Sequence, residues 1–359
     1  MNNKLKYVVT SLSFSIFILL IFIINIVKKD DLVSLSERRK LAQFPSISLK
    51  SILDGSFFDK FDKYTTDQFV KRDDLRGFKA NVELILKKNY NNLYLKDGYV
   101  IEQLYPLNVS SINNITDKIN LIKNNYLKDN NVYFSIIPDK NYFVNGNNLR
   151  IDYDKLQNIM VDNLNGIEYI NIFDRLSLNN YYMSDTHWKN ETLMDVVNVF
   201  ADKMNFNVSN NYNESYITDF NGVYSGQLPI GISHDEIKIL TNDIINSSVV
   251  YNYESNLNES VYNLDKVNSS DKYDVYLSGP VSLLKITNSN SKSKKDLIVF
   301  RDSYGSSIIP LFTEGYKSIT VVDTRYINPK LLSDYITFDN QDVLFLYSTL
   351  LINNSYSLK

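Results

Sequence analysis

The sequence predicts an α/β protein with three layers, in which helices cover both faces of a mostly parallel sheet. Short apolar segments typical of buried strands alternate with segments of helical period over residues 112–204. The same alternation returns between Asp296 and Tyr347. A further observation, an uncharged apolar segment near the N-terminus, predicts one transmembrane helix ahead of this domain.

Composition describes a folded protein and excludes several kinds of site. The chain has 359 residues, 44% of them hydrophobic and 22% charged, which is enough for a full core. A net charge of −3 gives no electrostatic case for binding nucleic acid. The sequence has no cysteine, so disulfides, zinc thiolate sites and cysteine nucleophiles are excluded.

The N-terminal segment predicts where the protein works. Tyr7 to Val27 carries no charge and is long enough to span a bilayer, whereas a cleavable signal peptide has a shorter apolar region and a small-residue cleavage site. We therefore predict a signal-anchor at residues 1–29 in the cell membrane, with the body outside the cytoplasm. Lysines flank both ends of the segment, so charge does not decide between this orientation and its opposite.

The elements that follow are predicted from periodicity and turn residues. Residues 30–90 form a helical stem, and residues 91–359 form the α/β domain, which opens with a hairpin around Asp97-Gly98. The polar, tyrosine-rich segment at about 206–285 is predicted to be an insertion or an irregular β-rich lobe. The regular elements alternate in this order: helix 112–126, strand 132–137, helix 156–164, strand 168–172, helix 192–204, strand 297–300, helix 306–312, strand 318–322 and strand 343–347.

Histidine chemistry has only two possible places in this chain, His187 and His234. Asp185 precedes His187 by two residues, so in an extended segment both side chains project from the same face, and the carboxylate could fix the imidazole tautomer. The alternative is a histidine that packs or faces water. A metal site is a weak alternative because too few ligands accompany the pair, and we predict no metal and no cofactor. His234 lies among turn residues and is predicted to be a surface histidine.

Ser303 follows the predicted strand 297–300 and precedes a helix with Gly305 near its start. This places it at the carboxyl end of a strand, where sites form in open α/β sheets, with helix N–H groups behind it. The alternative is a serine that only caps the helix. Together, Ser303, His187 and Asp185 are the residue types needed for acyl transfer through an activated hydroxyl.

Two other residues are secondary candidates for substrate contact. Lys140 stands just past the end of the strand at 132–137, on the same edge as Ser303, although a solvated turn explains it equally well. Trp188 is the sole tryptophan and follows the Asp-x-His pair directly. A tryptophan here is more often part of a core or cleft wall than a sugar platform.

Taken together, the motifs resemble one family. Ser184-Asp185-Thr186-His187-Trp188 is similar to the signature of the DHHW proteins of Gram-positive bacteria, which resemble the alginate O-acetyltransferase-type branch of the SGNH (GDSL-like) hydrolases. Arg301-Asp302-Ser303-Tyr304-Gly305 is similar to the nucleophile block of that group. Four further segments match in order: Ser36–Arg39, Asp67–Asp73, Pro138–Lys140 and Val322–Tyr326.

The resemblance implies an SGNH-like α/β/α domain that acts on acetyl esters of polysaccharides outside the cytoplasm. Ser303 would be the nucleophile, His187 the general base and Asp185 its orienter, with backbone N–H groups of Ser303 and Tyr304 near the oxyanion. Thr186 replaces the middle histidine of the signature, and its side chain is expected to point away from the other two. Arg301 stands where many relatives have glycine, so a tighter approach to the nucleophile is expected.

Three functions follow as hypotheses. The first is a membrane-anchored O-acetyltransferase for a cell-surface or secreted polysaccharide, supplied with acetyl by a multi-pass membrane acyltransferase of the MBOAT type. The second is a carbohydrate acetyl esterase with the same site. The third is a non-catalytic protein that binds polysaccharide or scaffolds an export complex, for which the tyrosine-rich segment 206–285 would supply stacking surfaces.

Overall fold

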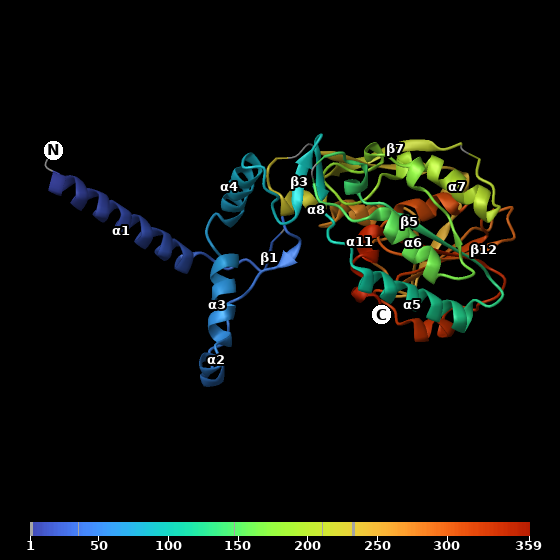
Figure 1. The fold of residues 1–359 in the computed structure, drawn as a ribbon, viewed down its shortest axis with the longest axis horizontal. Helices are drawn as coiled ribbons and strands as arrows, with labels where there is room; N and C mark the ends of the chain where they lie inside the picture. The colour runs from blue at the N-terminus through green and yellow to red at the C-terminus, as the bar shows by residue number, and fades with distance from the viewer. Residues whose placement is uncertain (1–2, 35, 147, 210, 232–233) are drawn as a thin grey trace. The chain divides into compact units, whose positions relative to one another are not determined.

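The computed structural model describes residues 3–34, 36–146, 148–209, 211–231 and 234–359. The chain divides into two compact units. The smaller unit contains residues 1–90 and 225–231, and the larger contains residues 91–224 and 232–359. Figure 1 shows the order of the elements along the chain.

The smaller unit begins with one long apolar helix, α1 (Asn3–Val27). Its segment Lys4–Val27 is long and apolar enough to cross a membrane, and no part of its most apolar stretch is buried inside the protein. The predicted apolar N-terminal helix is therefore confirmed. By length and composition it fits a signal anchor or a signal peptide.

The rest of the smaller unit is held together by ion pairs. Its regular elements are β1 (Val33–Ser34), β2 (Arg39–Lys40), α2 (Leu49–Leu53), α3 (Ser56–Asp67) and α4 (Arg72–Ile85). Arg39 pairs with Asp67 at 2.6 Å, and its hydrogen bonds lower the pKa of Asp67 to about 2. Arg72 pairs with Glu37 at 2.6 Å. Charged residues of two of the sequence segments, Ser36–Arg39 and Asp67–Asp73, thus bind one another.

The larger unit contains an eight-stranded sheet in the order β10-β9-β11-β13-β12-β14-β5-β6. The pairs β13–β12, β12–β14, β14–β5 and β5–β6 are parallel. The pairs β10–β9, β9–β11 and β11–β13 are antiparallel. The predicted mostly parallel α/β fold is confirmed. The strands are β5 (Asn131–Ile137), β6 (Glu168–Tyr169), β9 (Val249–Asn252), β10 (Leu257–Ser260), β11 (Leu283–Thr287), β12 (Asp296–Arg301), β13 (Ser318–Val322) and β14 (Asp342–Ser348).

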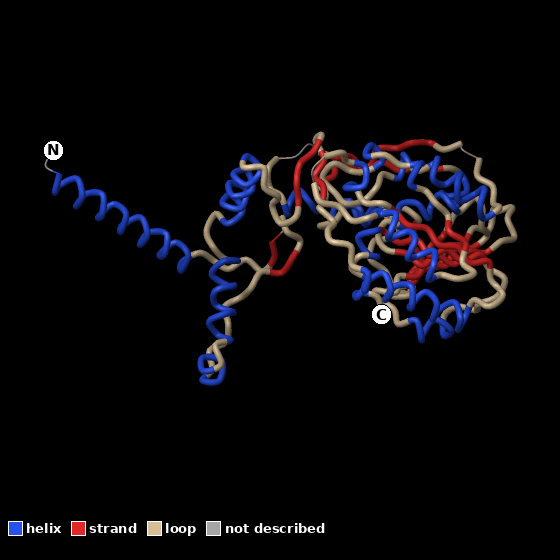
Figure 2. Tube along the Cα trace, in the orientation of Figure 1, coloured by secondary structure: helices blue, strands red, loops and turns tan. Residues whose placement is uncertain are grey.

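Helices cover this sheet on both faces, as Figure 2 shows for the larger unit. Alternate side chains of β12 enter different cores, because successive residues of a strand point to opposite faces. Leu297 and Val299 join the core formed with α7 (Met194–Met204). Ile298 and Phe300 join the core formed with α5 (Val109–Tyr126) and α6 (Tyr153–Asn163).

Three parts of the larger unit test local predictions. The hairpin around Asp97-Gly98 is confirmed as β3 (Leu93–Lys96) and β4 (Tyr99–Glu102). The helix predicted at 306–312 is shorter: α10 covers Gly305–Ile308 and a 3₁₀ turn follows, as expected where Pro310 lacks an N–H donor. The segment 206–285 contributes β9, β10 and part of β11 to the sheet, while β7 (Asn213–Phe220) and β8 (Asp235–Thr241) pair separately. The remaining short helices are α8 (Val223–Gln227), α9 (Asp243–Ser247) and α11 (Thr349–Ile352).

Candidate active site

Ser303 stands in a tight turn at the carboxyl end of β12, and its neighbour Asp302 holds this turn in place. One carboxylate oxygen of Asp302 accepts the backbone N–H of Tyr304 at 3.1 Å. The other accepts the backbone N–H and the hydroxyl of Ser348, at 2.8 and 2.6 Å. Because Ser348 ends the neighbouring strand β14, the nucleophile candidate is tied to two central strands. Ser303 itself is half-buried.

The Asp-x-His segment folds back on itself. Tyr181 and Trp188 form an antiparallel bridge, and the N–H of Tyr182 donates to the carbonyl of His187 at 3.1 Å. Within this loop, Asp185 Oδ1 accepts both the backbone N–H of His187 at 3.0 Å and its ring Nδ1 at 2.6 Å. Asp185 Oδ2 accepts the N–H of Val223 at 2.8 Å. The carboxylate therefore has three donors, which fix its orientation and that of the imidazole.

The structure brings the three predicted residues together. His187 Nε2 lies 2.8 Å from Ser303 Oγ, across a separation of 116 residues in the sequence. With Nδ1 of the same ring bound to Asp185, the Nε2 lone pair faces the serine hydroxyl. This is the geometry in which an imidazole can take the proton of a hydroxyl as that oxygen attacks an acyl carbon.

The electrostatics of the trio suit that chemistry. Asp185 is 1% exposed, and burial alone would raise its pKa. The charge of His187, together with hydrogen bonds from His187 and Val223, instead holds the pKa of Asp185 well below its usual range. Asp185 is therefore a carboxylate at neutral pH, able to stabilise an imidazolium at His187.

Trp188 and Thr186 join two segments that we call the histidine loop (residues 181–188) and the serine turn (residues 302–305). The indole Nε1 of Trp188 donates to the carbonyl of Tyr304 at 2.9 Å, and its ring is fully buried. The hydroxyl of Tyr304 donates to the carbonyl of Thr186 at 2.7 Å and lies 3.0 Å from Thr186 Oγ1. The sequence offered Trp188 as a secondary candidate for substrate contact and favoured a place in a core or cleft wall. The structure buries its ring, and its bond ties the turn that carries Ser303 to the loop that carries His187.

The predicted oxyanion donor Tyr304 N–H is engaged inside the turn by Asp302. The next N–H groups are also engaged: Gly305 donates to the carbonyl of Asp302 at 3.1 Å, and Ser306 to that of Ser303 at 3.2 Å. Helix α10 has only four residues, so the helix N-terminus expected behind Ser303 is short. Of the two predicted donors, the Ser303 N–H is the one that the turn leaves as a candidate.

Lys140 lies beneath the histidine loop, 3% exposed. Its Nζ donates to the carbonyls of Tyr182 and Met183 at 3.0 and 3.3 Å, and it lies 5.0 Å from the centre of the Tyr224 ring. Burial lowers the pKa of Lys140 to about 7, against the attraction of nearby carboxylates led by Asp185. The sequence left a substrate contact and a solvated turn equally open for Lys140. The structure excludes the solvated turn and shows Lys140 bound to the residues that precede Asp185.

The burial of Lys140 predicts a pH dependence of stability. The folded-state pKa of about 7 lies below the ordinary value of 10.5, so between these values the unfolded chain binds one more proton. The free energy of unfolding should therefore rise as pH increases from 7 to 10.5, by up to about 1.4 kcal/mol per pH unit. Below pH 7 Lys140 is protonated in both states, so its contribution no longer changes with pH. Lys140→Met should remove this slope in urea titrations made at pH 7 to 10. Equal slopes in both proteins would contradict the assignment.

Asp235 supports the segment before Asp185, and the sequence did not single it out. Its carboxylate accepts the backbone N–H groups of Met183 and Ser184, at 2.8 and 2.7 Å, and the hydroxyl of Ser184 at 2.6 Å. It thereby fixes the backbone directly before Asp185. Nothing local marks this aspartate, because it lies on β8, at the end of a turn-rich segment.

We expect Asp235→Ala to lower the free energy of unfolding by about 3 kcal/mol, because two buried N–H groups and a hydroxyl lose their acceptor. It should also lower kcat more than it raises KM, since the loop positions His187. Urea unfolding followed by the fluorescence of Trp188 measures the first effect. Glu236→Gln, at the next position with a side chain 52% exposed, is the control and should unfold like the wild type. An Asp235→Ala protein with the free energy of unfolding and the kcat of the wild type would contradict the positioning role.

Tyr273 and Gly222 complete the surroundings of His187 and Asp185. The ring of Tyr273 stacks on the imidazole at 3.9 Å with an angle of 10° between the planes, and its hydroxyl donates to Ser307 Oγ at 2.9 Å. This stack fixes the imidazole plane, and an electron-rich ring face favours a cationic imidazolium. Gly222 permits a close approach of the backbone to Asp185, since a Cβ there would lie 2.3 Å from Cβ of Asp185.

The second histidine, His234, lies on the surface as predicted: it is exposed, and its Nδ1 lies 2.7 Å from Asn221 Oδ1.

Arg301 does not narrow the approach to Ser303. Its side chain is fully buried, donates to the carbonyl of Gly279 at 3.0 Å and lies 3.6 Å from the carboxylate of Asp323. Arg325 donates to the same carboxylate at 2.9 and 2.6 Å. The expected crowding is thus replaced by a buried charge cluster behind the serine turn. Gly305 packs directly on this arginine, where a Cβ would lie 2.7 Å from Arg301 Cβ.

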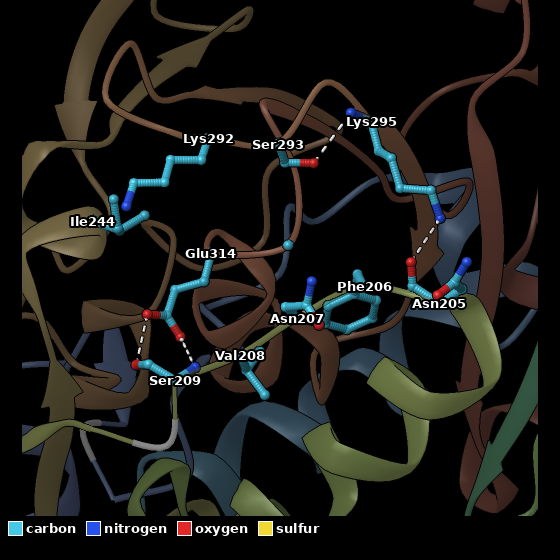
Figure 3. A pocket seen from close by; sticks show the side chains of 11 residues that line it. Asn205, Phe206, Asn207, Val208, Ser209, Ile244, Lys292, Ser293, Lys295 and Glu314 are labelled. Atoms are coloured by element: carbon cyan, nitrogen blue, oxygen red, sulfur yellow. Dashed lines mark hydrogen bonds between the residues drawn. The ribbon is translucent and has the colours of Figure 1, made fainter.

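Figure 3 shows a cavity of about 520 Å³ that none of Ser303, His187 and Asp185 lines. Lys295, in its wall, precedes β12, whereas Ser303 follows that strand, so roughly 20 Å of strand separates them. Lys295 is bound to the carbonyl of Met204 at 2.8 Å and Glu314 to the hydroxyl of Ser209 at 2.8 Å. These two charged side chains of the wall are therefore bound within the protein. Within the described residues, no group of three His, Asp or Glu side chains could hold a metal ion.

Comparison with solved structures decides the fold. The chain is similar to a DHHW family protein from Eubacterium siraeum, with a TM-score of 0.58 and 17% identity, covering 74% of this chain and 93% of that protein. It has the fold of a DHHW family protein. Bacillus cereus PatB1 is similar too, with a TM-score of 0.55 and 14% identity over 72% of this chain and 96% of PatB1. A structure of PatB1 with a sulfonyl adduct is similar with a TM-score of 0.56 and 16% identity, covering 72% of this chain and 95% of PatB1. No family model and no curated protein matches the sequence.

Proposed function

We propose that the protein is a membrane-anchored O-acetyltransferase that acts outside the cytoplasm and transfers acetyl to a polysaccharide through an acetyl-serine. One observation carries this proposal: Ser303 Oγ, His187 and Asp185 form a hydrogen-bonded chain of 2.8 and 2.6 Å. The exposed apolar helix α1 supports the anchor. The fold shared with DHHW proteins agrees with the resemblance of the motifs.

In the first step, Ser303 Oγ attacks the acetyl carbonyl as His187 Nε2 takes its proton. The leaving oxygen of the donor departs with that proton, and acetyl is left on the serine. In the second step, His187 takes the proton of a sugar hydroxyl as that oxygen attacks the acetyl carbon, and the proton returns to Ser303. Asp185 stabilises the imidazolium in both steps. Because the leaving group of the donor departs before the acceptor reacts with the acetyl-serine, the cycle follows ping-pong kinetics.

The acetyl source in this proposal is a membrane partner. Acetyl-CoA is a cytoplasmic compound, whereas the site would lie on the other side of the membrane. A multi-pass acyltransferase that carries acetyl across the bilayer would resolve this separation.

Acceptor choice is tested by product analysis. The full chain in detergent is given a chromogenic acetyl ester, with and without oligosaccharides from different polysaccharides. The proposal expects acetylated sugar to form at the expense of free acetate with at least one oligosaccharide. Free acetate alone in every case would indicate an esterase.

A non-catalytic role is tested separately. PatB1 carries a sulfonyl adduct in a solved structure. Sulfonyl fluorides modify activated hydroxyl nucleophiles, so a sulfonyl fluoride should add once to this chain and not to Ser303→Ala. Failure to react, combined with binding to an oligosaccharide, would indicate a binding protein.

A further inference from the structure

Helix α4 of the smaller unit has an apolar face that the described residues of this unit leave exposed. Four residues at helical spacing form this face, which we call the stem face: Leu75, Phe78, Val82 and Ile85. They are 51%, 71%, 39% and 79% exposed. Spacings of three and four residues place all of them on one side of the helix. In a soluble protein such a face is normally the buried one.

The other side of α4 is the side that the rest of the unit binds. Arg72 and Arg76 lie 2.6 and 3.4 Å from the carboxylate of Glu37, and Arg76 also donates to the carbonyl of Gly226 at 2.9 Å. Ala80 is fully buried. The helix is therefore fixed by its charged and small residues, and its apolar side chains point away from the contacts that hold it.

The start of α4 is bonded to the end of α1. Asn25, in the last turn of α1, accepts the N–H of Val70, two residues before α4 begins, at 2.8 Å. Gln68 binds both backbone groups of Asp31, accepting its N–H at 2.9 Å and donating to its carbonyl at 2.8 Å. If α1 spans a bilayer, these bonds hold the first turn of α4 at the membrane surface.

We infer that the stem face binds the lipid surface of the membrane in which α1 is anchored. Helices of this kind lie in the interface with their apolar side chains about 5–10 Å deep. The exposed side chains of Lys71 and Lys79, at 78% and 66%, suit such a position, since lysines extend to the headgroups from an interfacial helix. The inference rests on the proposed anchoring by α1. A second copy or a membrane protein over the same face is the competing possibility.

The absence of cysteine makes the test direct. Single cysteines are introduced into the full chain at Phe78 and Ile85 on the stem face, at Glu83 on another side of α4, and at Ile16 in α1. Each protein is spin-labelled and placed in nanodiscs that contain phosphatidylglycerol. Collision rates with oxygen, which concentrates in lipid, and with a water-soluble nickel complex then give the immersion of each label.

We expect the labels at Phe78, Ile85 and Ile16 to collide preferentially with oxygen, and the label at Glu83 with nickel. If the labels at Phe78 and Ile85 collide preferentially with nickel, as the label at Glu83 does, while the label at Ile16 is immersed, the inference is overturned. The proposed anchor would remain intact. A label at Ile16 in water would instead refute the anchor itself. Labels on the stem face that are shielded from both reagents would show a protein covering it, which also overturns the inference.

Discussion

Replacing Ser303 by alanine is expected to lower kcat for acetyl-ester turnover by on the order of 10⁶-fold, the loss seen when a serine nucleophile of this kind is removed. The structure offers the reason, since Ser303 Oγ is the hydroxyl bound by His187 Nε2 at 2.8 Å. Only binding and oxyanion stabilisation would remain in the variant. Release of the chromophore from an acetyl ester by the full chain in detergent is the measurement.

The fold should tolerate this change. The turn is held by Asp302 through Tyr304 and Ser348, and none of these bonds uses the Ser303 hydroxyl. The thermal midpoint should therefore stay close to that of the wild type. Ser255→Ala, at an exposed turn between β9 and β10, is the matched control and should keep full activity. Turnover by Ser303→Ala near the wild-type rate would exclude Ser303 as the nucleophile.

Replacing Asp185 by asparagine should lower kcat by about 10⁴-fold, as the same change does in serine proteases. Asp185 accepts three hydrogen bonds, two from His187 on Oδ1 and one from Val223 on Oδ2. An asparagine has one oxygen, so neither orientation of its amide can accept from both sides. With NH₂ toward the ring, the imidazole must carry its proton on Nε2 and cannot accept one from Ser303.

The same turnover assay measures this loss, with Asp162→Asn as the control. Asp162 is exposed on α6 and should tolerate the change. Asp185→Asn should also react with a sulfonyl fluoride far more slowly than the wild type, because the reagent reports activation of the hydroxyl. Wild-type labelling with lost turnover would show that Asp185 acts elsewhere in the cycle.

The central strands and the three candidate residues that the structure brings together could be predicted from the sequence for clear physical reasons. Leu297–Phe300 is a continuous apolar run, the pattern of a strand buried on both faces, and it is part of β12. Asp185 and His187 stand two residues apart, and a short-range hydrogen bond between them follows from that spacing. Their approach to Ser303 needed the fold, because 116 residues separate the two segments.

The supporting residues could not be predicted in this way. Asp235 and Tyr273 come from a segment without strong periodicity, and they reach the histidine loop only through β8 and a 3₁₀ turn. Lys140 was visible just past a strand end, and Trp188 directly after the Asp-x-His pair. Their complete burial depends on packing from distant elements, which local sequence does not encode.

The most direct test of the central claim is to trap the acyl-enzyme. The full chain is mixed with excess acetyl ester, quenched in acid within the first turnovers, digested and analysed by mass spectrometry. The account predicts one added acetyl group, located on Ser303, that disappears when an acceptor is supplied before quenching. An acetyl group on any other residue, or turnover without a covalent acetyl at any time point, would contradict the acetyl-serine mechanism.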